Sequence, residues 1–166
     1  SEDRKNLRNE LNKIETFYES EKKVDIEDLI KLTNLTENYS INKIVDLSLA
    51  KETKQTLRAL NENVFSNEDV IIIIRSYLIK SKRLLKLTKE FEKSNNIDQT
   101  ILSSKPPIFW KEKEIVKKQL RIWKHDRVKK LIENINNTEL QIKKNAESSI
   151  NLIKNFIIDQ SLKVNN

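Results

Sequence analysis

Apolar residues recur along most of this chain at spacings of three and four, the pattern of amphipathic helices packed by one face. The longest such stretch covers residues 67–92 and opens with Ser66 and Asp69, which have the spacing of a helix capping box. The apolar positions of this stretch, which recur near heptad spacing, are Val70, Ile74, Tyr77, Leu78, Leu84, Leu85 and Phe91. The pattern predicts one long helix that is buried on more than one side.

Shorter stretches with the same period predict further helices on both sides of the long one. They cover residues 2–20, 25–32, 41–49, 53–64, 98–102, 115–123, 126–142 and 150–162. Asp126 is expected to cap the helix that follows it, and Glu139 is expected to pair with Lys143 four residues further on. The sequence therefore predicts an all-α helical bundle.

The chain contains no glycine and no cysteine. Loops that hold phosphate groups need glycine for positive φ angles and for close backbone approach, so nucleotide sites of that kind are excluded. Without cysteine there is no thiolate metal site, and His125, the single histidine, cannot supply a histidine site alone. No paired carboxylates or nucleophile and base stand at catalytic spacing. We expect no metal, no cofactor and no catalytic residue.

No segment of the sequence is typical of a membrane protein. The longest uninterrupted apolar run, Val70 to Ile74, has five residues, against the roughly 20 that span a bilayer. The first residues are polar and of mixed charge, unlike a signal peptide. We expect a cytoplasmic protein that does not contact a membrane.

Charge is distributed unevenly along the chain. Residues 1–38 carry 7 Lys or Arg and 10 Asp or Glu, a net charge of −3, whereas residues 39–166 carry 25 and 15, a net charge of +10. No helical period continues through residues 33–38. The change in charge and the break in period together predict a domain boundary at this point.

Both prolines, both tryptophans and the histidine fall within residues 106–125. Pro106 and Pro107 disfavour helix before and between them, so they predict a turn that ends one helix and orients the next. Trp110 and Trp123 are flanked by Ile, Phe or Leu, and we expect them to be core or loop anchors.

Two basic segments admit two interpretations. Residues 105–130 carry ten Lys or Arg against three acids, and residues 75–93 carry seven against two. Such segments can follow a phosphate backbone, with Phe109 and Trp110 as stacking platforms. They can also be helix faces exposed to solvent. This is the commoner role of charge runs and the interpretation that we favour here.

Three motifs follow one another in the second half of the chain, and two more lie near its start. They are Lys105-Pro-Pro-Ile-Phe-Trp-Lys-Glu-Lys113, Gln119-Leu-Arg-Ile-Trp123, Thr138-Glu-Leu-Gln-Ile-Lys143, Asp3-Arg4 with Leu7, Glu10, Leu11 and Lys13, and the segment Val24 to Leu32. Taken in their order along the chain, the five motifs resemble the C-terminal part of the bacterial DNA polymerase III delta subunit, a component of the clamp loader. The resemblance runs through nearly the whole chain.

The resemblance implies a layout and a role. Residues 1–38 would be two helices of a truncated AAA+ related lid domain, and residues 39–166 the collar domain that joins the loader's subunits. The expected partners are subunits of the gamma/tau and delta-prime types in DNA replication. The sliding clamp would be bound only by an N-terminal domain that these residues do not include. Family delta subunits do not hydrolyse ATP, so this piece of a DNA polymerase III holoenzyme would not be an enzyme.

The resemblance also indicates which residues belong to the motif and to a possible interface. They are Pro106, Pro107, Phe109, Trp110, Gln119, Trp123 and Lys143. Some delta proteins carry an aromatic residue that meets the template strand shortly after the last motif. Here that stretch has none, so only Lys143 and Lys144 are candidates for proximity to DNA, which would be contacted weakly or indirectly. The alternative is a stand-alone basic helical module that binds nucleic acid, motivated by the net charge of +10.

Overall fold

The computed structural model describes residues 35–162. Side chains are described from Ile41, and the residues that follow it belong to one compact unit. The helices predicted within residues 2–20 and 25–32 lie outside the described residues. So do residues 1–34 of the segment assigned to a lid domain, whereas residues 35–38 belong to helix α3, which continues past the predicted boundary to Leu49. Every regular element within the described range is helical, so the prediction of an all-α bundle is confirmed.

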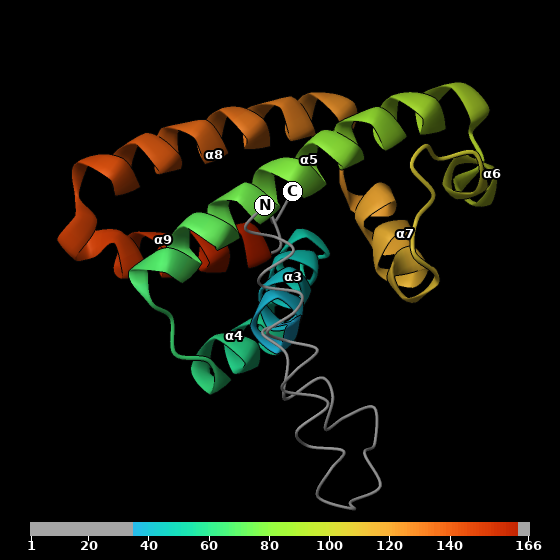
Figure 1. The fold of residues 1–166 in the computed structure, drawn as a ribbon. Helices are drawn as coiled ribbons and strands as arrows, with labels where there is room; N and C mark the ends of the chain where they lie inside the picture. Colours follow the sequence, from blue (N-terminus) through green and yellow to red (C-terminus); the bar gives the residue numbers. More distant parts are fainter. Residues whose placement is uncertain (1–34, 163–166) are drawn as a thin grey trace, which may run out of the picture. The chain divides into compact units, whose positions relative to one another are not determined.

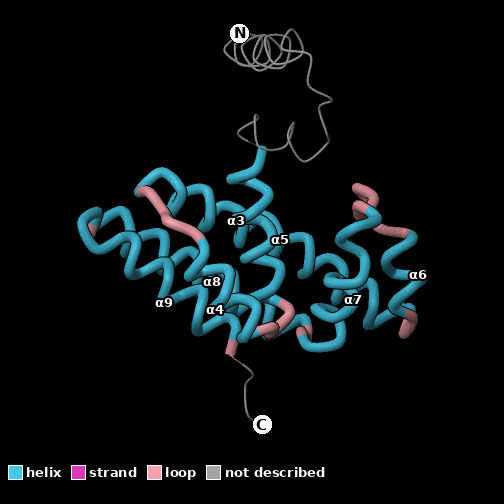
Figure 2. The backbone as a smooth tube through the Cα atoms, turned by 90° about the horizontal axis from the view of Figure 1, so that it is seen from below, coloured by secondary structure: helices cyan, strands magenta, loops and turns pink. Residues whose placement is uncertain are grey.

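Short connections join the helices of this unit, as Figure 2 shows. The helices are α3 (Leu35–Leu49), α4 (Thr53–Glu62), α5 (Asn67–Ser94), α6 (Ile97–Leu102), α7 (Lys113–Ile122), α8 (His125–Lys144) and α9 (Ser149–Ser161), with 3-10 turns η1 (Trp110–Glu112) and η2 (Ala146–Ser148).

The long helix α5 is the element that most of the others contact (Figure 1). It begins at the predicted capping box: the Asp69 amide donates to Ser66 Oγ at 3.2 Å, and the Ser66 amide donates to Asp69 Oδ2 at 2.7 Å. It ends at Asn95, whose φ of 50° is left-handed. Asparagine tolerates this conformation well, which lets a chain without glycine end its longest helix sharply.

Helices α3, α5, α8 and α9 supply the most deeply buried side chains of the core. Each contributes side chains that are at most 1% exposed, among them Ile73 and Tyr77 of α5, Ile135 of α8 and Ile153 of α9. The Tyr77 ring packs edge-on against Phe156 with centroids 5.0 Å apart. Truncating one such aliphatic side chain to alanine typically costs about 2–5 kcal/mol. Burial of these few positions is thus a principal source of the unit's stability.

The buried stripe of α5 differs from the predicted heptad pattern. Leu78, Leu85 and Phe91 are only half-buried, whereas Lys80 and Ser81 are buried. A helix of 3.6 residues per turn drifts about 20° per heptad from a 3.5-residue repeat, so a strict heptad does not describe one face over 28 residues. With Ser76 and Thr88, which are also buried, four polar residues therefore lie on the side of α5 that faces the rest of the bundle.

Two predictions of local structure are wrong and one is confirmed. Asp126 does not cap α8, because Lys124, two residues earlier, occupies the N-cap position. The helix predicted over residues 53–64 ends at Glu62, and the side chain of Val64 beyond it is 99% exposed. The predicted ion pair is present: Lys143 Nζ lies 2.7 Å from Glu139 Oε1.

Candidate interaction site

The proline turn connects α6 to η1, and no helix crosses it, as the sequence predicted. Pro106 and Pro107 are exposed, and the Lys105–Pro106 peptide bond is cis. The Ser104 hydroxyl donates to the Pro106 carbonyl at 2.9 Å. Ile108, 6% exposed, is the residue by which the turn enters the core.

The two aromatic residues after Ile108 remain outside the core. Phe109 is 54% exposed and Trp110 is 67% exposed, with ring centroids 5.8 Å apart and ring planes inclined by 50°. The Lys111 ammonium lies 5.2 Å from the centroid of the Trp110 ring, within range of a cation–π contact. The prediction that Trp110 is an anchor is wrong, because Ile108 takes the buried position and leaves both rings at the surface.

Trp123 is the anchor that the sequence predicted. Its ring is 9% exposed, and its Nε1 donates to the Leu49 carbonyl at 2.7 Å. The Lys51 ammonium lies 4.8 Å from the ring centroid and donates to the Gln160 carbonyl at 2.5 Å. Burial, and secondarily the charge of Arg127, lower the pKa of Lys51. These contacts join the ends of α3, α7 and α9.

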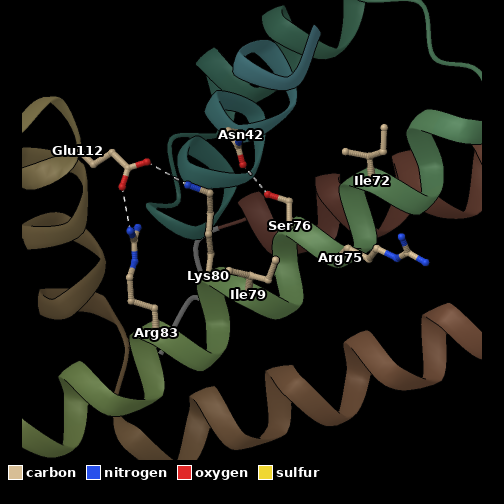
Figure 3. A pocket seen from close by; sticks show the side chains of 8 residues that line it. All are labelled: Asn42, Ile72, Arg75, Ser76, Ile79, Lys80, Arg83 and Glu112. Atoms are coloured by element: carbon tan, nitrogen blue, oxygen red, sulfur yellow. Dashed lines mark hydrogen bonds and ion pairs between the residues drawn. The ribbon is translucent and has the colours of Figure 1, made fainter. Parts of the chain in front are cut away.

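A largely buried polar network holds the first turn after the prolines against the bundle, and Figure 3 shows three of its members, Lys80, Arg83 and Glu112. The Glu112 carboxylate accepts from Arg83 Nη1 at 2.8 Å and from Lys80 Nζ at 3.4 Å. Lys80 Nζ also donates to Asp46 Oδ2 at 2.7 Å. Gln119 Nε2 donates to the Asp46 carbonyl at 3.1 Å. We call these five residues the Lys80 network; it links α3, α5, η1 and α7.

The two carboxylates of the Lys80 network respond differently to their surroundings. Burial raises the pKa of Asp46, and the nearby Lys80 ammonium only partly offsets this effect. Burial alone would also raise the pKa of Glu112, but hydrogen bonds and charges from Arg83 and Lys80 together lower it. The contacts of Glu112 thus favour its charged form, whereas burial disfavours the charged form of Asp46 and Lys80 compensates only in part.

Gln119 and Trp123 serve the interior of the bundle. Gln119 is 3% exposed and is committed to Asp46, and Trp123 is committed to Leu49. Both side chains therefore face the interior of this unit, and their assignment to a possible interface stays a prediction. Of the motif residues around the turn, Pro106, Pro107, Phe109 and Trp110 are the exposed ones.

Lys143 and Lys144 lie at the C-terminal end of α8, where both are exposed. In Figure 1 this end of α8 is next to α9, whereas α7 and the turn before it lie at the opposite end of α5. The structure therefore does not bring the two lysines together with the exposed rings. Lys143 is also engaged by its ion pair with Glu139.

The sequence analysis missed the Lys80 network. A signal was available, because Lys80 stands three residues after Tyr77 and four before Leu84, so it shares the buried stripe of α5. Asp46 likewise stands between Val45 and Leu47 in a predicted helix. Charged side chains are almost never fully buried unless they are paired, so sequence alone suggests that they reach solvent. Burial of Lys80 and Asp46 could be expected only once each had been recognised as the partner of the other.

The described residues contain no group of three or more His, Cys, Asp or Glu side chains placed to hold a metal ion. His125 is half-buried, and its Nδ1 lies 3.3 Å from Thr88 Oγ1. Over the same part of the chain, no helix combines the length and the apolar character that a bilayer crossing requires.

The Lys80 network predicts that removing one of the two buried charges, Lys80 or Asp46, destabilises the fold more than removing both. Lys80→Met leaves Asp46 buried with its main cation removed, and we expect unfolding free energy to fall by about 3–5 kcal/mol. Asp46→Leu combined with Lys80→Met removes both charges and should recover most of that loss. Urea unfolding at neutral pH measures each variant. Lys82→Met, at an exposed position of the same helix, is the control, expected within about 0.5 kcal/mol of the wild type. Equal destabilisation in the single and double variants would contradict the pairing.

Comparison with known proteins adds no family assignment to this geometry. No family model matches the chain, and no curated protein or solved structure matches it significantly.

Proposed function

We propose that this helical unit is the collar-type assembly domain of a clamp-loader subunit of the delta kind. In this role it binds subunits of the gamma/tau and delta-prime types during DNA replication and performs no chemistry itself. The order of the motifs supports the proposal, as does the all-α architecture of the residues described. The observation that carries it is the exposure of Phe109 and Trp110 inside one of those motifs.

Exposed rings on a fixed turn are suited to protein assembly. Tryptophan is enriched among residues that dominate interface energetics, because it buries a large area with few rotatable bonds. The turn is held on one side by Ile108 in the core and on the other by Glu112 in the Lys80 network. A partner would therefore bind rings whose backbone is already ordered, which lowers the entropic cost of association.

A second candidate function rests on the charge around the same rings. Lys105, Lys111 and Lys113 belong to the turn and to the residues directly after it, and Lys111 lies against the Trp110 ring. Aromatic rings accompanied by lysines can stack on bases while the ammonium groups approach phosphates. This combination favours a basic helical module that binds single-stranded nucleic acid.

The assembly proposal predicts co-elution of the full chain with the loader's gamma/tau and delta-prime type subunits in size-exclusion chromatography. Phe109→Ala with Trp110→Ala should weaken that association at least about tenfold, since about 1.4 kcal/mol corresponds to that factor and two rings are lost. Val64→Ala, at an exposed apolar residue elsewhere in the unit, should leave it unchanged. The proposal would be overturned by failure to co-elute, or by equal effects in the two variants.

The nucleic-acid candidate predicts quenching of Trp110 fluorescence by a single-stranded oligonucleotide at low salt. The chain has two tryptophans, and only Trp110 is accessible to a base. Trp123→Phe should keep the quenching and Trp110→Phe should abolish it, and affinity should fall steeply as salt is raised. Absence of quenching at low salt would remove this candidate without affecting the assembly proposal.

A further inference from the structure

A second exposed surface lies on α5, beside the Lys80 network. Ile72 is 40% exposed and Ile79 is 69% exposed. They are seven positions apart in the sequence, so they lie on one face of the helix, about 10 Å apart along its axis. Figure 3 shows both isoleucines on α5 with the network residues beside them.

The two isoleucines line an open groove of about 440 Å³. Its lining residues come from α3, α5 and η1, and are Asn42, Ile72, Arg75, Ser76, Ile79, Lys80, Arg83 and Glu112. We call it the Ile72–Ile79 groove.

Hydrogen bonds and ion pairs fix the polar part of this groove. Ser76 Oγ donates to Asn42 Oδ1 at 2.7 Å, which ties α5 to α3. Lys80 and Arg83 both bind Glu112, which ties α5 to η1. The apolar side chains left for a ligand are those of Ile72 and Ile79.

One positive charge of the groove is left over. Lys80 has Asp46 as its carboxylate partner, and Arg83 has Glu112. Arg75 stands between the two isoleucines in sequence, its side chain is exposed, and it forms no ion pair with any residue that the structure describes. Along two turns of α5 the groove thus presents an apolar side chain, Ile72, then a basic one, Arg75, and then a second apolar one, Ile79.

We infer that the Ile72–Ile79 groove docks an amphipathic, acidic helix of another protein. Two apolar side chains of that helix, about two turns apart, would pack against Ile72 and Ile79, and a carboxylate would pair with Arg75. This is the spacing by which helices are recognised in grooves. The groove is formed by α5 and its neighbours α3 and η1, so the inference depends neither on the exposed rings of Phe109 and Trp110 nor on the clamp-loader assignment.

Charge favours an acidic partner over a second copy of this chain. A symmetric pairing through the groove would bring Arg75 towards Arg75, and each chain carries a formal net charge of +7. An acidic helix relieves that repulsion and supplies the carboxylate that Arg75 lacks among the described residues.

The test uses the full chain and two fluorescein-labelled synthetic helices of about three heptads each. Both carry leucine along one face; one has glutamate at the flanking positions and the other has lysine. Fluorescence anisotropy should show the glutamate helix binding the wild type at least tenfold more tightly than the lysine helix. Arg75→Glu should reverse this preference, which a purely structural role of Arg75 would not do. Ile79→Asp should weaken binding at least tenfold, and Ile79→Leu should preserve it.

Two controls separate the groove from general attraction to a basic protein. Lys89→Glu makes the same change in charge at another exposed position of α5 and should leave the preference in place. Leu140→Asp alters an exposed apolar residue of α8 and should leave affinity unchanged.

Three results would overturn the inference. They are equal effects of Arg75→Glu and Lys89→Glu, no binding of the glutamate helix, and self-association in sedimentation that Ile79→Asp abolishes. Co-elution with loader subunits that is unaffected by Arg75→Glu and Ile79→Asp would leave the assembly proposal intact while giving the groove no part in it.

Discussion

The Lys80 ammonium makes the interaction on which the rest of this unit depends. It is buried on α5, where its charge is tolerable only because Asp46 lies 2.7 Å away and Glu112 lies 3.4 Å away. Removing two charges from water is expensive, and their attraction offsets that expense only in a well-formed geometry. The pairing therefore favours one relative placement of α3, α5 and η1, whereas apolar contacts alone tolerate several.

This constraint determines what the unit presents to solvent. Glu112 faces Arg83 and Lys80, and it belongs to the same short turn as Trp110. With Ile108 buried before the turn and Glu112 paired at its end, the rings between them are left at the surface. The same ion pairs fix one side of the Ile72–Ile79 groove. Both proposed contact surfaces thus adjoin a single polar network.

The sequence predicted elements better than it predicted which side chains are exposed. The period of apolar residues and the Ser66 capping box were enough to place α5, because both signals are local. The start of α8 was misplaced by two residues, since Asp126 is acceptable both as a cap and within the first turn. Local pattern could not decide which of Ile108, Phe109 and Trp110 enters the core. That choice depends on the pairing of Glu112 with residues about thirty positions earlier.

The most direct test of this account is amide hydrogen exchange in Glu112→Gln, compared with Glu114→Gln. In η1 the Glu112 amide donates to the Phe109 carbonyl at 2.9 Å, and the Lys113 amide donates to the Trp110 carbonyl. If the Lys80 network holds this turn, both amides should exchange about tenfold faster in Glu112→Gln, which corresponds to about 1.4 kcal/mol of local opening free energy. They should be unchanged in Glu114→Gln, whose exposed carboxylate contacts only Lys117 among the described residues. Equal exchange in the wild type and Glu112→Gln would contradict the account.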